Sequence, residues 1–88
     1  MTYEITWSRQ ARRALSSELP ETVAAACLEF VLGPLATSPY RVGKPLREPE
    51  QGLFSARRGE FRVIYRIDEG RILVQVVSVR HHRDAYRT

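Results

Sequence analysis

Arginines gather in the second half of the chain, where they could bind phosphate and stabilise its charge. Residues 41–88 hold eleven basic and six acidic side chains, whereas residues 1–40 hold three and four. Lys44 is the only lysine among the 14 basic residues. A guanidinium group is planar, binds two phosphate oxygens at once and stacks on bases. The net charge of +4 and the arginine bias therefore indicate either a phosphate or nucleic-acid partner or a solvated basic surface.

The segment after residue 52 predicts a sheet that would hold some of these arginines in place. The predicted strands cover residues 53–57, 60–67 and 71–79, and Arg58-Gly59 and Glu69-Gly70 separate them. Two-residue connections that end in glycine are typical of β-hairpins. The three strands are therefore expected to form an antiparallel meander.

The register set by these two turns puts Arg62 on the face of the sheet that the helices leave uncovered. On the core face, the register pairs Tyr65 with Val74, Val63 with Val76 and Phe61 with Ser78. On the other face Arg62 lies opposite Val77, with Ser55 beside it. A central strand holds a side chain more rigidly than a loop does, which suits a site that stabilises developing phosphate charge. The alternative is that Arg62, like Arg66, only solvates an exposed sheet face.

The stretch VRHHRDAYRT, residues 79–88, could supply proton-transfer groups that arginines cannot provide. It contains both histidines, His81 and His82, and a tyrosine, Tyr86. Histidine exchanges protons near neutral pH, and tyrosine can donate or orient a proton. A solvated His82 and a Tyr86 that packs over the sheet edge are the plainer interpretations. No metal is expected, because adjacent histidines in extended chain diverge and no cysteine cluster or HExxH spacing accompanies them.

The first half of the chain predicts one strand and two helices. Residues 2–7 alternate as a strand does, and Ser8 stands at the N-cap of a helix that ends before Pro20. The second helix should end at Gly33-Pro34, and residues 34–52 read as a loop with room for one helical turn. The predicted buried face of the second helix holds Val23, Ala26, Cys27, Phe30 and Val31. We therefore predict one α+β domain over residues 1–88, in the order β-α-α-β-β-β, with two helices on one face of a mainly antiparallel four-stranded sheet.

Composition and length exclude several classes of protein. No apolar run approaches the roughly 18 residues that span a bilayer, and the first residues lack the layout of a secretory signal, so we expect a cytoplasmic protein without membrane contact. Cys27 is the only cysteine, which rules out an intramolecular disulfide. Its apolar surroundings would raise the thiol pKa and argue against a nucleophilic role.

Three motifs, taken in order, resemble the RelE branch of the RelE/ParE superfamily of bacterial toxins. They are GKPL at residues 43–46, RRGEFRVIYRID at 57–68 and HHRDAYR at 81–87. The resemblance implies a toxin of a type II toxin-antitoxin pair, bound and silenced by a cognate antitoxin in a hetero-oligomer. It also implies a ribosome-dependent endoribonuclease that cuts mRNA in the A site without a cofactor. The 2′-hydroxyl would attack the adjacent phosphate and leave a 2′,3′-cyclic phosphate.

The resemblance assigns roles to four residues of this chain. Arg62 matches the phosphate-stabilising arginine of the middle strand, and Arg80 matches a second arginine after the last strand. Tyr86 matches a tyrosine that stacks on a base or transfers a proton, and His81 matches a common histidine. We further expect five other basic residues of this half to contact RNA or phosphate: Lys44, Arg47, Arg57, Arg58 and Arg83.

One departure from the family pattern leaves the general base open. The best-studied RelE pattern has lysines where this chain has Leu53 and Ser55, so His81 or His82 becomes the expected base, because arginine is a poor proton acceptor. Two other functions stay open. A ParE-like protein would inhibit DNA gyrase without cutting RNA, and an inactive module would only bind its antitoxin in a groove beside the first helices.

Overall fold

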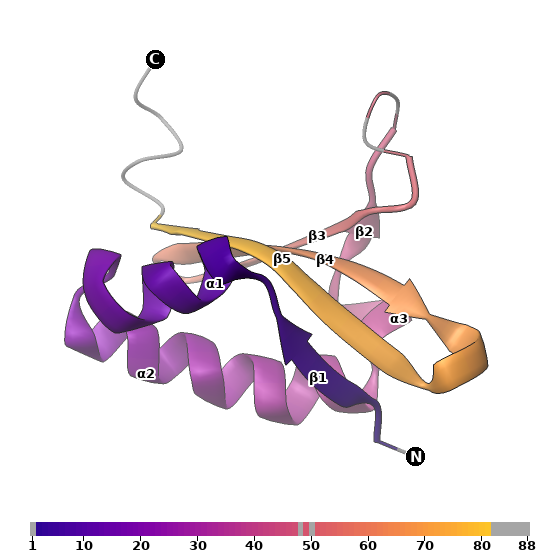
Figure 1. Ribbon diagram of the computed structural model, residues 1–88, viewed down its shortest axis with the longest axis horizontal. Coiled ribbons are helices and arrows are strands. Elements are labelled where there is room, and N and C mark those ends of the chain that lie inside the picture. The colour runs from indigo at the N-terminus through magenta and orange to yellow at the C-terminus, as the bar shows by residue number, and fades with distance from the viewer. Residues whose placement is uncertain (1, 48, 50, 82–88) are drawn as a thin grey trace.

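The computed structural model of the protein describes residues 2–47, 49 and 51–81, and it shows helices on one face of a twisted sheet (Figure 1). The elements are β1 (Glu4–Trp7), α1 (Arg9–Arg13), the π-helical turn η1 (Ala14–Glu18), α2 (Glu21–Phe30), the π-helical turn η2 (Val31–Leu35), α3 (Pro39–Val42), β2 (Lys44–Pro45), β3 (Phe54–Arg58), β4 (Phe61–Asp68), the 3-10 turn η3 (Glu69–Arg71) and β5 (Leu73–His81). The α+β class and the layer of helices are as predicted. None of the helices in the described residues is long and apolar enough to cross a membrane.

The sheet has five strands in the order β1-β5-β4-β3-β2, so the predicted count of four is wrong. β1 runs parallel to β5, and the other neighbours are antiparallel. The additional strand is β2, which lies in the segment expected to be a loop and pairs Lys44 with Ser55.

Gly43 allows β2 to approach the sheet this closely. A Cβ atom at this position would overlap the Tyr65 hydroxyl and lie 2.9 Å from the Ser55 carbonyl oxygen. The Tyr65 hydroxyl is buried there and donates a hydrogen bond to the Pro39 carbonyl oxygen at 2.6 Å. The glycine of the GKPL motif is therefore a contact point between the loop and the sheet, and it fixes the residue that follows it, Lys44.

Both predicted helices begin as expected, and the first ends before Pro20 as η1, but the second ends differently. Ser8 is the N-cap of α1, and its hydroxyl accepts a hydrogen bond from the Ala11 N–H at 3.1 Å. The second helix does not stop at Gly33-Pro34, because it continues through Pro34 as η2. A π turn moves the backbone bonds by one residue, and burial of Val31 and Leu35 favours the continuation. Ala26, predicted to be buried, is exposed.

Both predicted turns are shifted, although the predicted faces survive. The β3–β4 turn is Gly59-Glu60, so Arg57 lies opposite Arg62 instead of Ser55 beside it. The β4–β5 connection includes η3 and Ile72, which has a left-handed φ of 51°, so β5 starts two residues later than expected. A shift of two residues keeps each side chain on its own face. Ser55 consequently still shares the open face with Arg62.

A β-bulge in β5 then changes the faces beyond Val76. Tyr65 pairs with Val76 and Ile64 pairs with Ser78, which leaves Val77 as the extra residue. After the bulge, Val79 faces the core with 3% exposure. Arg80 therefore lies on the open face opposite Arg62, and the predicted pairing of Arg62 with Val77 is wrong.

The core lies between the helices and the inner face of the sheet. The largest fully buried side chains from the strands are Tyr65, Val63, Val74 and Val76. Cys27 of α2 is fully buried against this layer, and burial raises the pKa of its thiol to about 11. The expectation that Cys27 is not a nucleophile fits this position.

Candidate functional site

Three arginines from three neighbouring strands form a row across the open face of the sheet. Arg57 of β3 lies directly opposite Arg62 of β4, and Arg62 lies directly opposite Arg80 of β5. Adjacent strands are about 4.8 Å apart, so the side chains start close together. Arg62 is half-buried, and the two outer arginines are exposed. We call this group the arginine row.

The side chains of Arg62 and Arg80 form no hydrogen bond or ion pair with another residue that the structure describes. Like charges directly opposite one another in a sheet are destabilising. Within the described part of the chain, the charges of Arg62 and Arg80 therefore lie side by side without an acidic partner. Such a surface suits an anionic ligand with several oxygens, and phosphate is the natural match for guanidinium groups.

The neighbouring row on the same face supplies hydroxyl, ammonium and apolar groups. Ser55 lies between Lys44 on β2 and Ile64 on β4, and Ile64 pairs with Ser78 on β5. A hollow of about 370 Å³ joins the two rows. Its lining residues are Leu46, Leu53, Ser55, Arg62, Ile64, Ser78 and Arg80. An apolar floor with cationic walls can hold a base and its phosphate together.

A second hollow continues this surface toward β2. It has a volume of about 520 Å³ and shares Leu46, Ser55 and Arg62 with the first. Lys44 and Arg57 also line it. The two hollows together run along the sheet from β5 to β2, so a chain of linked phosphates fits the charge pattern better than one isolated anion.

Two predicted site residues lie on the other face of the sheet. Arg58 is stacked over the Phe30 ring, with its guanidinium carbon 4.9 Å from the ring centroid. His81 pairs with Phe61 on the helix-covered side, and its Nε2 atom lies 3.8 Å from a carboxylate oxygen of Glu60. The structure does not bring His81 or Arg58 to the arginine row. The bulge puts His81 on the helix-covered face, and the shifted turn makes Arg58, which was predicted to lie in the turn, the last residue of β3.

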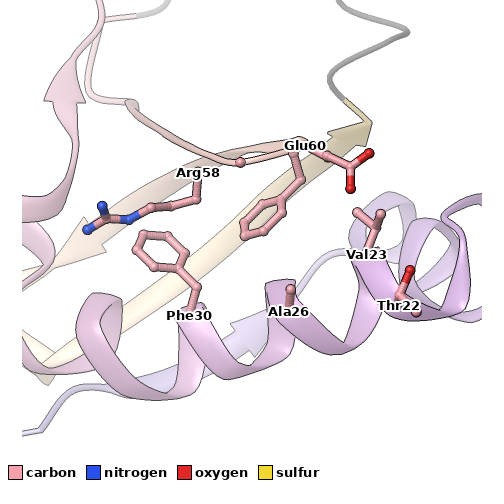
Figure 2. Close-up of a pocket in the computed structure, with 8 residues that line it drawn as sticks. Thr22, Val23, Ala26, Phe30, Arg58 and Glu60 are labelled. Atoms are coloured by element: carbon pink, nitrogen blue, oxygen red, sulfur yellow. The ribbon is translucent and has the colours of Figure 1, made fainter.

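Figure 2 shows the surroundings of Arg58, a groove of about 380 Å³ between α2 and the β3–β4 turn. Val23, Ala26 and Phe30 project from α2 on one side. Arg58 and Glu60 stand on the other side with opposite charges. We call this hollow the α2 groove, and it is separate from the arginine row.

Other predicted residues are not placed in the row. Arg47 is exposed, directly after Leu46. The expected roles of His82, Arg83 and Tyr86 fall outside the described residues. Among the residues that are described, no three His, Cys, Asp or Glu side chains gather as metal ligands would.

Comparison with known proteins identifies the family to which this fold and surface belong. Residues 5–86 match the family model described as the ParE toxin of type II toxin-antitoxin systems, parDE. The chain belongs to this RelE/ParE toxin family. The protein is therefore a toxin of the type II toxin-antitoxin class, as the motifs suggested.

Toxins from Mycobacterium tuberculosis are similar over nearly the whole chain. Toxin RelE is 47% identical over 85 residues, which cover 97% of this chain and 87% of that toxin. Toxin RelG is 46% identical over 87 residues, which cover 99% of both. These names place the chain beside RelE toxins within a family whose model carries the ParE name.

Solved structures of RelE/ParE toxins share the fold. The toxin-antitoxin complex RelBE2 from M. tuberculosis contains a chain with a TM-score of 0.89 and 44% identity, covering 92% of this toxin and 99% of that chain. The isolated RelE toxin of E. coli has a TM-score of 0.72 at 17% identity, covering 90% and 83%. The second comparison supports the fold alone.

Sequence reasoning missed three residues that line the hollow beside the arginine row: Leu46, Ile64 and Ser78. The side chain of Ile64 was assigned to the correct face but was given no role. Ser78 was assigned to the core face. The sequence does contain one sign of the bulge. Ser78 is polar but falls at a position that strict alternation would turn toward the core, which suggests that the strand contains an extra residue.

Proposed function

We propose that this toxin is a ribosome-dependent endoribonuclease that cuts mRNA at the arginine row. The observation that carries the proposal is the direct cross-strand alignment of Arg57, Arg62 and Arg80 on one uncovered face. Similarity to toxins named RelE supports the same reaction class.

The row is suited to stabilising the transition state of phosphodiester cleavage. The RNA 2′-oxygen attacks the adjacent phosphorus, the bond to the 5′-oxygen breaks, and a 2′,3′-cyclic phosphate and a 5′-hydroxyl result. Negative charge grows on the phosphorane oxygens during attack. Arg62, at the centre and half-buried, would donate hydrogen bonds to them together with Arg80. Loss of one comparable donor typically slows such a reaction by about 10² to 10³.

Lys44 is our candidate for protonating the leaving 5′-oxygen. The family pattern places lysines where this chain has Leu53 and Ser55, but β2 brings Lys44 directly opposite Ser55. A lysine ammonium group can give up a proton to an alkoxide, whereas a guanidinium group holds its protons too tightly to do so well. His81 faces the helix layer, so we assign it no proton transfer. The 2′-hydroxyl proton would leave to water, with the ribosome supplying alignment.

The test is primer extension on a message translated in the presence of the purified toxin. We expect cuts within codons that Arg62→Gln reduces by about 10² to 10³. Arg66→Gln is the matched control, because Arg66 is on the same strand and face but pairs with Gln75. Intact message together with inhibited DNA supercoiling would refute the nuclease and favour the gyrase-directed alternative suggested by the ParE family name.

We further propose that a cognate antitoxin binds this toxin and uses the α2 groove. The similar chain in RelBE2 comes from a toxin-antitoxin complex. The groove is largely apolar, with Val23, Ala26 and Phe30 along α2, and Arg58 beside it. A smaller hollow of about 250 Å³ extends the α2 groove past Ala26 and Phe30 toward Pro34. An amphipathic segment with an acidic residue facing Arg58 would match these features.

Two neighbouring alanines on α2 give a matched test of this contact. Ala26 lines the groove and its extension, whereas Ala25 is exposed and lines neither. With the toxin co-expressed beside the product of the adjacent gene, Ala26→Arg should lower the affinity of the pair at least tenfold and Ala25→Arg should not. Equal affinities for both variants would place the antitoxin elsewhere.

A further inference from the structure

One extra residue in β5 decides which face of the sheet carries Arg80. If the pairing of Tyr65 with Val76 continued without a bulge, Arg80 would lie opposite Phe61 and face the helices. The bulge at Val77 instead brings Arg80 opposite Arg62. The arginine row therefore depends on the bulge.

A single residue from another element bonds the backbone at this bulge. The Ser8 N–H donates to the Val76 carbonyl oxygen at 2.9 Å, and the Ser8 hydroxyl donates to the Val77 carbonyl oxygen. The parallel pairing of β1 with β5 ends at Trp7 and Val76, so Ser8 is the first residue beyond it. An extra residue in a ladder lacks a cross-strand partner, and a buried carbonyl without a donor is costly. Ser8 supplies the missing donor.

The Ser8 hydroxyl serves two elements at once. Its oxygen accepts the Ala11 N–H at the start of α1 while its proton goes to Val77. Serine and threonine can do both, because a hydroxyl is a donor and an acceptor. An ionised aspartate accepts well at an N-cap but has no proton to donate. The two roles can therefore be separated by substitution.

We propose that Ser8 is a positioning residue for Arg80, holding the β5 bulge that keeps this arginine in the row. Its importance for cleavage rests on the proposed nuclease function, whereas its hold on the bulge does not. Ser8 touches neither the hollow nor Arg62, so its effect on RNA chemistry would pass entirely through β5.

The test combines amide hydrogen exchange with cleavage kinetics in Ser8→Asp, Ser8→Thr and a control, Ser17→Ala. Ser17 is an exposed serine of η1. Its hydroxyl also donates to a backbone carbonyl, that of Arg13 at 3.0 Å, but it does not bond to the residues of the bulge. We expect Ser8→Asp to raise exchange at residues 78–80 at least tenfold while α1 keeps its protection. Cleavage should fall about tenfold in the same variant, and Ser8→Thr and Ser17→Ala should match the parent.

Each result has a defined meaning. Unchanged exchange at residues 78–80 in folded Ser8→Asp would overturn the proposal, as would the same loss in Ser17→Ala. If Ser8→Asp does not fold, Ser8→Ala replaces it, with exchange in α1 reporting the cap and exchange at residues 78–80 reporting the bulge. If the parent toxin cuts no RNA but the exchange pattern appears, the nuclease proposal fails and the role of Ser8 in the bulge stands.

Discussion

Replacing Arg62 by glutamine should make the free toxin more stable while it removes activity. Arg62 lies between two other guanidinium groups in the row, on Arg57 and Arg80. Two unit charges about 6 Å apart repel by about 0.7 kcal/mol in water, and flexible side chains relieve part of this repulsion. For the contact with Arg80, Arg62→Gln should raise the free energy of unfolding by about 0.2–0.7 kcal/mol at low salt, within the range for cross-strand pairs.

Urea unfolding at two salt concentrations measures this effect. Salt screens exposed charges, so the parent should gain stability as salt rises and the difference from Arg62→Gln should shrink. Arg66→Gln, on the same face of β4 but opposite Gln75, should behave like the parent. A lower stability of Arg62→Gln at low salt, or an equal gain in Arg66→Gln, would refute the claim that Arg62 and Arg80 repel one another.

Three other outcomes follow from individual contacts. Gly43→Ala should cost about 1–3 kcal/mol in urea unfolding, because the new methyl group must displace the buried Tyr65 hydroxyl; a loss near zero would contradict the close approach. The thiol of Cys27, fully buried and with its pKa raised to about 11, should react with a thiol reagent near pH 8 only on unfolding, and rapid labelling of the native toxin would count against the packed core. A hydrogen bond to Glu69 raises the pKa of Tyr3 to about 12 from 10.0, so its contribution to stability should be complete below pH 10 and lost as pH rises through 12. Tyr3→Phe should remove this alkaline loss, and an unchanged pH profile would exclude the contact.

The sequence predicted the face of Arg62 correctly because face depends only on parity. Errors of two residues at both turns left every side chain of β4 on its own side. The predicted cross-strand partner of Arg62 was wrong, because alternation fixes the face of a side chain but not the register between two strands. The αL conformation of Ile72 lengthens the β4–β5 connection, and an isoleucine gives no hint of it because β-branched residues rarely adopt positive φ.

The bulge was harder to predict, although the sequence contains a trace of it. Strict alternation from Val74 and Val76 would turn Ser78 and Arg80 inward and Val79 outward, which contradicts their polarity. One inserted residue resolves the conflict, and the structure has it at Val77. The donor for the bulge comes from Ser8, far away in sequence, so only tertiary structure could identify it.

The prediction missed β2 and the continuation of α2 because prolines and glycines were taken to end regular structure wherever they occur. Four prolines in residues 34–52 argue against regular structure. The two-residue strand β2 nevertheless forms, because the close approach of Gly43 to Tyr65 brings it beside β3. Pro34 is accommodated within a π turn, where burial of Val31 and Leu35 outweighs the lost backbone bond.

The parallel pairing of β1 with β5 joins the first strand of the fold to its last (Figure 1). During synthesis, β1 cannot pair with β5 until the ribosome has made residues 73–76. Contacts between such distant parts of a chain form late and slow the folding of a domain. Arg80 lies on the same strand, so the arginine row becomes complete only after β5 has been made and has paired with β4.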